Sequence, residues 1–152
     1  METFRDDLEY GRVAEVACKD YLLRRGYDIV EDAPKEYFPD YDVRFYTGGN
    51  WYNVEVKRDR KAKFTGNIAI EVFNSCSNSS SGLSATSAHY YYISTDDADY
   101  VLRTGELRAY IDSRFNDDPR SYVLGGDGGC SAIVLLKIAD IEGLAIDKVY
   151  KG

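Results

Sequence analysis

The 152-residue sequence lacks the features of several specialised classes of protein. It has no apolar run of about 18 residues, the length that a membrane-spanning helix needs. It also has no positively charged, apolar N-terminal segment of the kind that directs secretion. We therefore expect a cytoplasmic protein with no membrane partner.

Cysteine is scarce, with only Cys18, Cys76 and Cys130 in the chain. The three lie far apart, form no Cys-x-x-Cys pair and are odd in number. This pattern argues against a disulfide framework and against a zinc or iron–sulfur site. We expect free thiols and no disulfide-linked partner.

Excess positive charge is also absent, because 19 Lys and Arg residues face 26 Asp and Glu residues, for a net charge of −7. Binding to phosphates normally needs a basic surface. The exception is residues 57–63, Lys-Arg-Asp-Arg-Lys-Ala-Lys, which we call the basic strip. An acidic protein with such a strip is expected to bind a polyanion weakly and with marked salt dependence.

A hydrophobic content of 44%, with 14 tyrosines, indicates a globular chain. Its length is that of a single domain, which we expect to span residues 1–152. Apolar periodicity predicts the following elements: helices at 7–25, 81–89, 105–115 and 139–144, and strands at 27–30, 67–73, 90–94, 100–103 and 131–138.

Residues 40–59 have the clearest pattern in the chain. Val43 and Phe45 alternate with polar residues, and Val54 and Val56 do so again after Thr-Gly-Gly-Asn. A period of two with glycines between the two runs predicts a β-hairpin. Alternation then places Glu55 and Lys57 on one face, and the hairpin can bring Asp42 beside them.

Two carboxylates and an ammonium group on one sheet edge can hold Mg²⁺ and orient a water molecule. Mg²⁺ prefers oxygen ligands and keeps several waters, so two protein carboxylates suffice when a phosphate completes its shell. A lysine can position the attacking water and stabilise the charge that builds on phosphorus.

The pattern of Asp42 followed by Glu55-Val56-Lys57 resembles the PD-(D/E)XK nuclease superfamily. The resemblance implies an α/β (α+β) fold with a restriction-endonuclease-like αβββαβ core, a mixed sheet flanked by helices. Pro39-Asp40 precedes Asp42, so two aspartates compete for the first acid. We prefer Asp42, because it leads directly into the alternating strand.

Two flanking segments extend this resemblance. Gly-x-x-x-Glu on the first helix is similar to the opening of Holliday-junction-resolvase-like members, which would make Glu15 a third carboxylate. An exposed helical glutamate is the alternative. After the hairpin, a strand, a Ser-Gly-x-x-x-Thr turn at Ser81–Thr86 and an aromatic strand resemble phage-type endonucleases of the superfamily. A phage-encoded protein would act in the host cytoplasm.

The resemblance implies metal-dependent hydrolysis of DNA phosphodiesters, in recombination or repair. Asp42, Glu55 and the carbonyl of Val56 would bind Mg²⁺, with Mn²⁺ able to substitute. Glu15 would support the metal through water, and Lys57 would orient the attacking water. Branched or junction DNA and a homodimer are the substrate form and assembly that a resolvase would use.

The residues expected to contact DNA come from the basic strip and the Ser/Thr turn: Arg58, Arg60, Lys61, Lys63, Ser81 and Thr86. The pattern leaves Glu71 open between the acidic site and solvent. The metal mechanism does not need His89, so we expect a structural or surface role for it. A catalytically silent nucleic-acid-binding or assembly protein on the same scaffold is the main alternative. Glycoside hydrolysis by a carboxylate pair would leave the lysine and the basic strip unexplained.

Overall fold

The computed structural model describes residues 4–34, 41–74, 76, 79–80, 82–84, 86–115, 122–125 and 129–151. In chain order its elements are α1 (Phe4–Arg24), β1 (Ile29–Asp32), β2 (Val43–Thr47), β3 (Asn50–Asp59), α2 (Ala62–Thr65), β4 (Asn67–Asn74), β5 (Ser79–Ser80), the 3₁₀ helix η1 (Gly82–Ser84), β6 (Tyr90–Thr95), β7 (Ala98–Arg103), α3 (Thr104–Phe115), β8 (Val123–Gly125), β9 (Ser131–Lys137), α4 (Ile138–Leu144) and β10 (Ala145–Tyr150).

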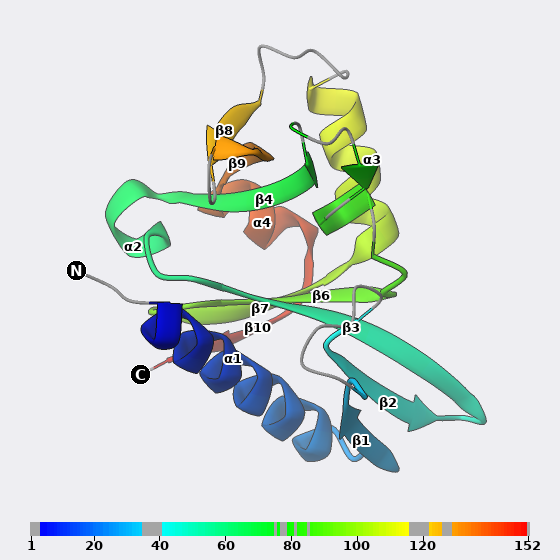
Figure 1. Cartoon of the computed structure of the whole chain (residues 1–152). Helices are drawn as coiled ribbons and strands as arrows, with labels where there is room; N and C mark the ends of the chain where they lie inside the picture. The colour runs from blue at the N-terminus through cyan, green and yellow to red at the C-terminus, as the bar shows by residue number, and fades with distance from the viewer. Residues whose placement is uncertain are drawn as a thin grey trace.

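The larger sheet has six strands in the order β1-β2-β3-β6-β7-β10. β3 and β6 are parallel, and the other neighbours in this sheet are antiparallel. The predicted hairpin is β2–β3, and Gly48 and Gly49 in its turn both have positive φ, as a tight hairpin turn requires. The sheet is mixed and flanked by helices, which confirms the predicted fold class (Figure 1).

The two faces of this sheet belong to two hydrophobic cores. On one face, Ala14, Cys18 and Leu22 of α1 pack against Val54 and Val56 of β3. The opposite face packs against the second sheet, α3 and α4 (Figure 1). β3 therefore lies at the centre of the molecule, with one face sealed by α1.

The predicted strand at residues 67–73 exists as β4, but it lies in a second sheet of order β5-β4-β9-β8. Ile68 and Ile70 are buried in the core that the two sheets share. The three strands that follow α1 in the larger sheet are therefore β1, β2 and β3, and β4 is not among them. The next strand of the chain in that sheet is β6. The pattern identified the strand but not its sheet, because both sheets bury an alternating apolar face.

Two other expectations need correction. The helix predicted at 81–89 is reduced to the single 3₁₀ turn η1, with Ser81 and Ala85 outside the described residues. The chain also ends in a strand, β10, that the pattern did not predict. Among the described residues, no helix combines the length and apolarity needed to cross a membrane.

The expectation of three free thiols was wrong. Cys76 and Cys130 form a disulfide, and Cys18 is a buried free thiol in the core beneath α1. Cys76 follows β4 and Cys130 precedes β9, and these two strands pair with each other. A sequence separation of 54 residues therefore hid two cysteines that the antiparallel pairing brings together.

Candidate active site

Glu55 and Lys57 project from β3 on the face opposite to α1. Val54 and Val56 are buried against α1, so the alternation of the strand turns the two charged side chains the other way. Lys57 Nζ lies 3.3 Å from Glu55 Oε1. Glu55 is 12% exposed and Lys57 is 42% exposed. The lysine thus reaches solvent from a carboxylate that is mostly buried.

Asp42 lies beside this pair, at the entry to β2. Its backbone N–H donates to the carbonyl of Val54 at 2.9 Å, and its Oδ2 accepts from the N–H of Val56 at 2.8 Å. The antiparallel register of β2 and β3 continues to Asp42 and places it across from Glu55. Asp40, the competing first acid, lies outside the described residues.

Glu15 approaches Asp42 from α1. It is half-buried, and burial together with the negative charge of Asp42 raises its pKa. Burial also raises the pKa of Asp42, against the opposing effect of the Val56 N–H. Burial raises the pKa of Glu55 too, where Asp42 adds to the shift and Lys57 opposes it. Asp42 thus interacts electrostatically with the Glu55–Lys57 pair of the hairpin and also with Glu15 of α1, which covers the other face of β3.

Burial is the main cause of all three raised pKa values, and a bound positive charge would lower them again. No cluster of three or more acidic, His or Cys ligands forms among the described residues. A pair of carboxylates such as Asp42 and Glu55 can hold Mg²⁺ only when waters and phosphate complete its shell. Glu15 fits as a support that acts through water.

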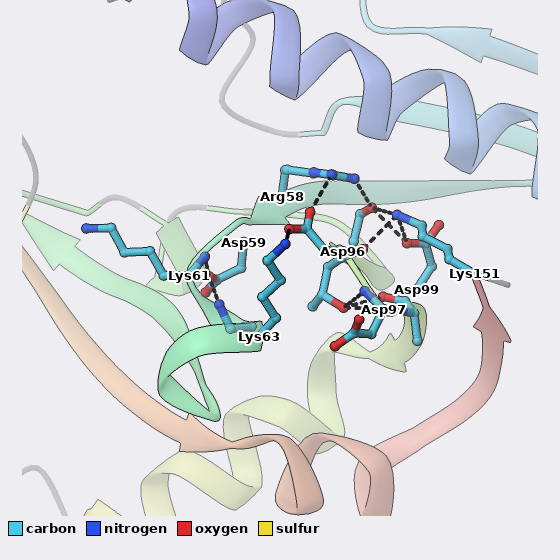
Figure 2. Close-up of polar contacts among 12 residues, drawn as sticks. Arg58, Asp59, Lys61, Lys63, Asp96, Asp97, Asp99 and Lys151 are labelled. Atoms are coloured by element: carbon cyan, nitrogen blue, oxygen red, sulfur yellow. Dashed lines mark hydrogen bonds and ion pairs between the residues drawn. The ribbon is translucent and has the colours of Figure 1, made fainter. Parts of the chain in front are cut away.

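The basic strip is compensated by acids from another part of the chain (Figure 2). Asp96 accepts from Arg58 Nη2 at 2.9 Å and pairs with Lys63 Nζ at 3.1 Å. Its pKa is lowered, chiefly by the hydrogen bond from Lys63. Asp59 caps α2 by accepting from the N–H groups of Lys61 and Ala62. The sequence did not show that Arg58 and Lys63 are paired, because Asp96 lies far from the basic strip along the chain.

Sequence reasoning did not identify Lys151 as a further paired cation, because its partners lie far from it along the chain. Lys151 Nζ contacts Asp99 Oδ1 at 2.8 Å and Ser94 Oγ at 2.8 Å (Figure 2). Asp99 is buried and also accepts from the hydroxyls of Ser94 and Tyr92. This network ties the end of the chain to β6 and β7.

Replacing Asp96 with Asn should tighten the binding of duplex DNA, by about tenfold at low salt. The substitution removes the carboxylate that holds Lys63 and Arg58, so at least one more cation can meet a phosphate. The slope of log affinity against log salt should steepen by about 1. Titration by fluorescence anisotropy at several salt concentrations measures both quantities.

Asp97→Asn is the matched control, since Asp97 is an exposed neighbour with the same charge. It should change affinity less and leave the salt slope as in the wild type. Equal effects of the two substitutions would mean that only net charge matters and would contradict the pairing argument.

Of the other predicted DNA contacts, Lys61 is exposed, Arg60 is half-buried and Ser81 lies outside the described residues. Thr86 is 5% exposed, and its hydroxyl donates to Glu55 Oε2 at 3.4 Å. The structure therefore gives Thr86 a contact with the acidic site. Arg108 of α3, which the sequence did not single out, donates to the carbonyl of Thr86 at 2.7 Å and supports that contact.

The two residues left open by the sequence have structural contacts. Glu71 accepts a hydrogen bond from the hydroxyl of Ser131 across β4 and β9. His89 joins the start of β6 to β3, since its N–H donates to the carbonyl of Asn53 at 2.8 Å and its Nδ1 accepts from the N–H of Asn53 at 2.9 Å. His89 thus has a structural contact, which agrees with an expected role outside the cleavage chemistry.

Comparison with known proteins bears on the family and the fold. No family model matches the sequence. Over 94 residues the chain is 30% identical to a UPF0102 protein of Shewanella halifaxensis (strain HAW-EB4), a match that covers 61% of this chain and 79% of that relative. The structure of the present chain is similar to that of the bacterial homing endonuclease I-Ssp6803I. The two have a TM-score of 0.52 and 17% sequence identity, and the match covers 90% of this chain and 77% of the endonuclease. The chain therefore belongs to the UPF0102 family, on the nuclease scaffold of the PD-(D/E)XK, or restriction-endonuclease-like, superfamily.

Proposed function

We propose that this protein is a metal-dependent endonuclease that hydrolyses DNA phosphodiesters. The observation that carries the proposal is the meeting of Asp42 and Glu55 at β3, with Lys57 Nζ 3.3 Å from Glu55 Oε1. The nuclease scaffold supports it independently. One domain spanning residues 1–152 would hold the complete set of catalytic side chains.

Each side chain has a role that follows from its position. Asp42 and Glu55 would hold Mg²⁺, or Mn²⁺ in its place, and the main chain of Val56 fixes the orientation of Asp42. The ion would supply positive charge for the phosphate oxygens and lower the pKa of a bound water. Glu15 would hold that water shell from α1. Thr86 and the buried strand restrain Glu55, so little reorganisation is needed when substrate binds.

Lys57 is the residue placed to handle the attacking water. Its ammonium group is partly exposed at the rim of the acidic pair, where it can donate a hydrogen bond to water or to a phosphate oxygen. Its positive charge would also offset the negative charge that grows on the phosphate in the transition state.

The substitution Lys57→Met should lower the rate of Mg²⁺-dependent DNA cleavage by about a hundredfold or more. It should not abolish metal binding, because the carboxylates remain and lose a competing cation. Cleavage of a labelled plasmid with Mg²⁺ or EDTA measures activity, and the rise in Tm on adding Mg²⁺ measures metal binding.

Lys61→Met is the control, because it removes an exposed lysine of the basic strip and spares the site. It should weaken DNA binding only modestly. Full cleavage by Lys57→Met would contradict the role of the lysine, and cleavage that persists in EDTA would contradict metal dependence.

A silent DNA-binding protein on the same scaffold is the second candidate, and it is favoured by the absence of a cluster of three or more metal ligands among the described residues. Such a protein would bind DNA in EDTA and cut no DNA form with Mg²⁺. Selectivity for junctions and action as a homodimer, in recombination or repair, are finer proposals. Paired, symmetric cuts in four-way junction DNA test them, and their absence would leave the endonuclease proposal standing.

A further inference from the structure

A cavity of about 470 Å³ lies beside the candidate active site, where β6 and α3 begin. Its lining includes three aromatic rings and four polar side chains: Tyr52, His89, Tyr90, Arg103, Thr104, Glu106 and Arg108. Its volume is in the range of cavities that bind small organic groups. The residues of the proposed cleavage chemistry do not line it.

The aromatic side of the cavity is held in place by its contacts. The rings of Tyr52 and His89 meet edge to face with centroids 5.4 Å apart, and the rings of Tyr52 and Tyr90 lie 6.2 Å apart. Two hydrogen bonds between His89 and Asn53 fix the imidazole against β3. Tyr52 and Tyr90 also pack against the core beneath α1. A planar ring could stack here without first ordering the wall.

The opposite side supplies polar groups. Thr104 is 2% exposed, lines the cavity, and its hydroxyl has no hydrogen-bond partner within the described part of the chain. A buried polar group of this kind gains free energy when a ligand satisfies it. Arg103 is exposed at the rim, and its contact with Glu106, at 3.4 Å between exposed side chains, is too weak to compete with a phosphate.

The cavity and the acidic site share a wall. Arg108 lines the cavity and donates to the carbonyl of Thr86, while the Thr86 hydroxyl donates to Glu55. Thr86 thus connects Arg108 in the cavity lining with the carboxylate of Glu55. A nucleic-acid strand with a base in the cavity would have Glu55 two contacts away, through Arg108 and Thr86.

We propose that this cavity binds an unpaired nucleobase of the DNA strand next to the phosphate that is cleaved. The proposal rests on the endonuclease function proposed above. Aromatic stacking holds a base irrespective of its identity, Thr104 hydrogen-bonds its polar edge, and Arg103 contacts the adjoining phosphate. The substrate class is therefore DNA with at least one unpaired base, at a nick, flap, bulge or branch, in preference to continuous duplex.

The test uses 2-aminopurine, a fluorescent base whose emission falls when it stacks. It is placed as a single unpaired base in one duplex and as a paired base in another. Both are titrated with Lys57→Met protein in Mg²⁺, in which cleavage is slow. We expect the unpaired probe to bind about tenfold more tightly than the paired one and to lose emission on binding.

Tyr52→Leu should remove both the preference and the emission change, and Arg103→Gln should reduce the preference from an exposed position where folding is not at risk. Tyr150→Leu, which removes an exposed tyrosine on β10, is the control and should behave as the parent protein. Equal binding of the two probes would overturn the proposal. So would displacement of the probe by an equal concentration of free dAMP, which would assign the cavity to a mononucleotide.

Cleavage by the wild-type protein is scored separately on gels. Stacking without cleavage of any DNA form would contradict the endonuclease function while leaving the base site in place. Cleavage that is equally fast on paired and unpaired substrates would contradict the base site while leaving the endonuclease function in place.

Discussion

Glu55→Gln is expected to lower the rate of Mg²⁺-dependent DNA cleavage by at least about a thousandfold. The substitution keeps the size and hydrogen-bonding capacity of the side chain and removes the charge that would bind the ion. Asp42 alone is a poor Mg²⁺ site, so the rise in Tm on adding Mg²⁺ should be lost together with cleavage. Single-turnover cleavage and thermal unfolding measure the two effects.

Without metal the same variant should be more stable than the wild type at neutral pH. Burial raises the pKa of Glu55 from its ordinary value of 4.5, so the folded protein holds this proton more tightly than the unfolded chain. The free energy of unfolding therefore falls as pH rises from 4.5 through the raised pKa, and the loss is complete above it. Glu55→Gln should make this fall smaller, as measured by urea unfolding between pH 4 and pH 8.

Glu142→Gln is the matched control. Glu142 is an exposed glutamate on α4 that pairs with Lys148 and lies outside the site. It should cleave DNA as the wild type does and show the same response of Tm to Mg²⁺. Full activity of Glu55→Gln, with Glu142→Gln also unchanged, would remove Glu55 from the site.

The second large effect concerns the second sheet. Cys76→Ser should lower the free energy of unfolding by about 4 kcal/mol, because the lost disulfide no longer restricts the unfolded chain over a separation of 54 residues. In a protein of this size the Tm should fall by roughly 10 °C. Calorimetry under non-reducing conditions measures both values.

Reductant provides the internal control. Dithiothreitol should bring the Tm of the wild type down to that of Cys76→Ser and should leave the variant unchanged. Cys18 is buried and unpaired, so it should not contribute to this difference. An unchanged wild-type Tm on reduction would contradict a stabilising disulfide.

The sequence allowed the centre of the site to be predicted because that centre is local. Asp42, Glu55 and Lys57 belong to one hairpin, where alternation and turn chemistry determine which side chains share a face. Glu15 lies outside the hairpin, and its place was predicted only by resemblance to a known helix pattern. The negative charge of Asp42 contributes to the raised pKa of Glu15, and a metal-supporting role for Glu15 stays a prediction.

What could not be predicted depends on pairing between distant segments. Asp96 meets Arg58 and Lys63 because the turn between β6 and β7 lies beside the end of β3. Thr86 meets Glu55 because the segment that leads into β6 lies beside β3. Local periodicity tells which face of a strand is buried, but it carries no information about the strand that lies next to it.

The parallel pairing of β3 with β6 also sets the order in which the chain acquires its chemistry during synthesis. The β2–β3 hairpin closes among neighbouring residues, which takes microseconds. The pairing of Val54 with Tyr90 requires a long loop to close first and is intrinsically slower. A nascent chain should therefore bring Asp42 and Glu55, the proposed metal ligands, together before it builds the wall of the aromatic cavity. Any selectivity for unpaired bases should arise only after Tyr90 has left the ribosome.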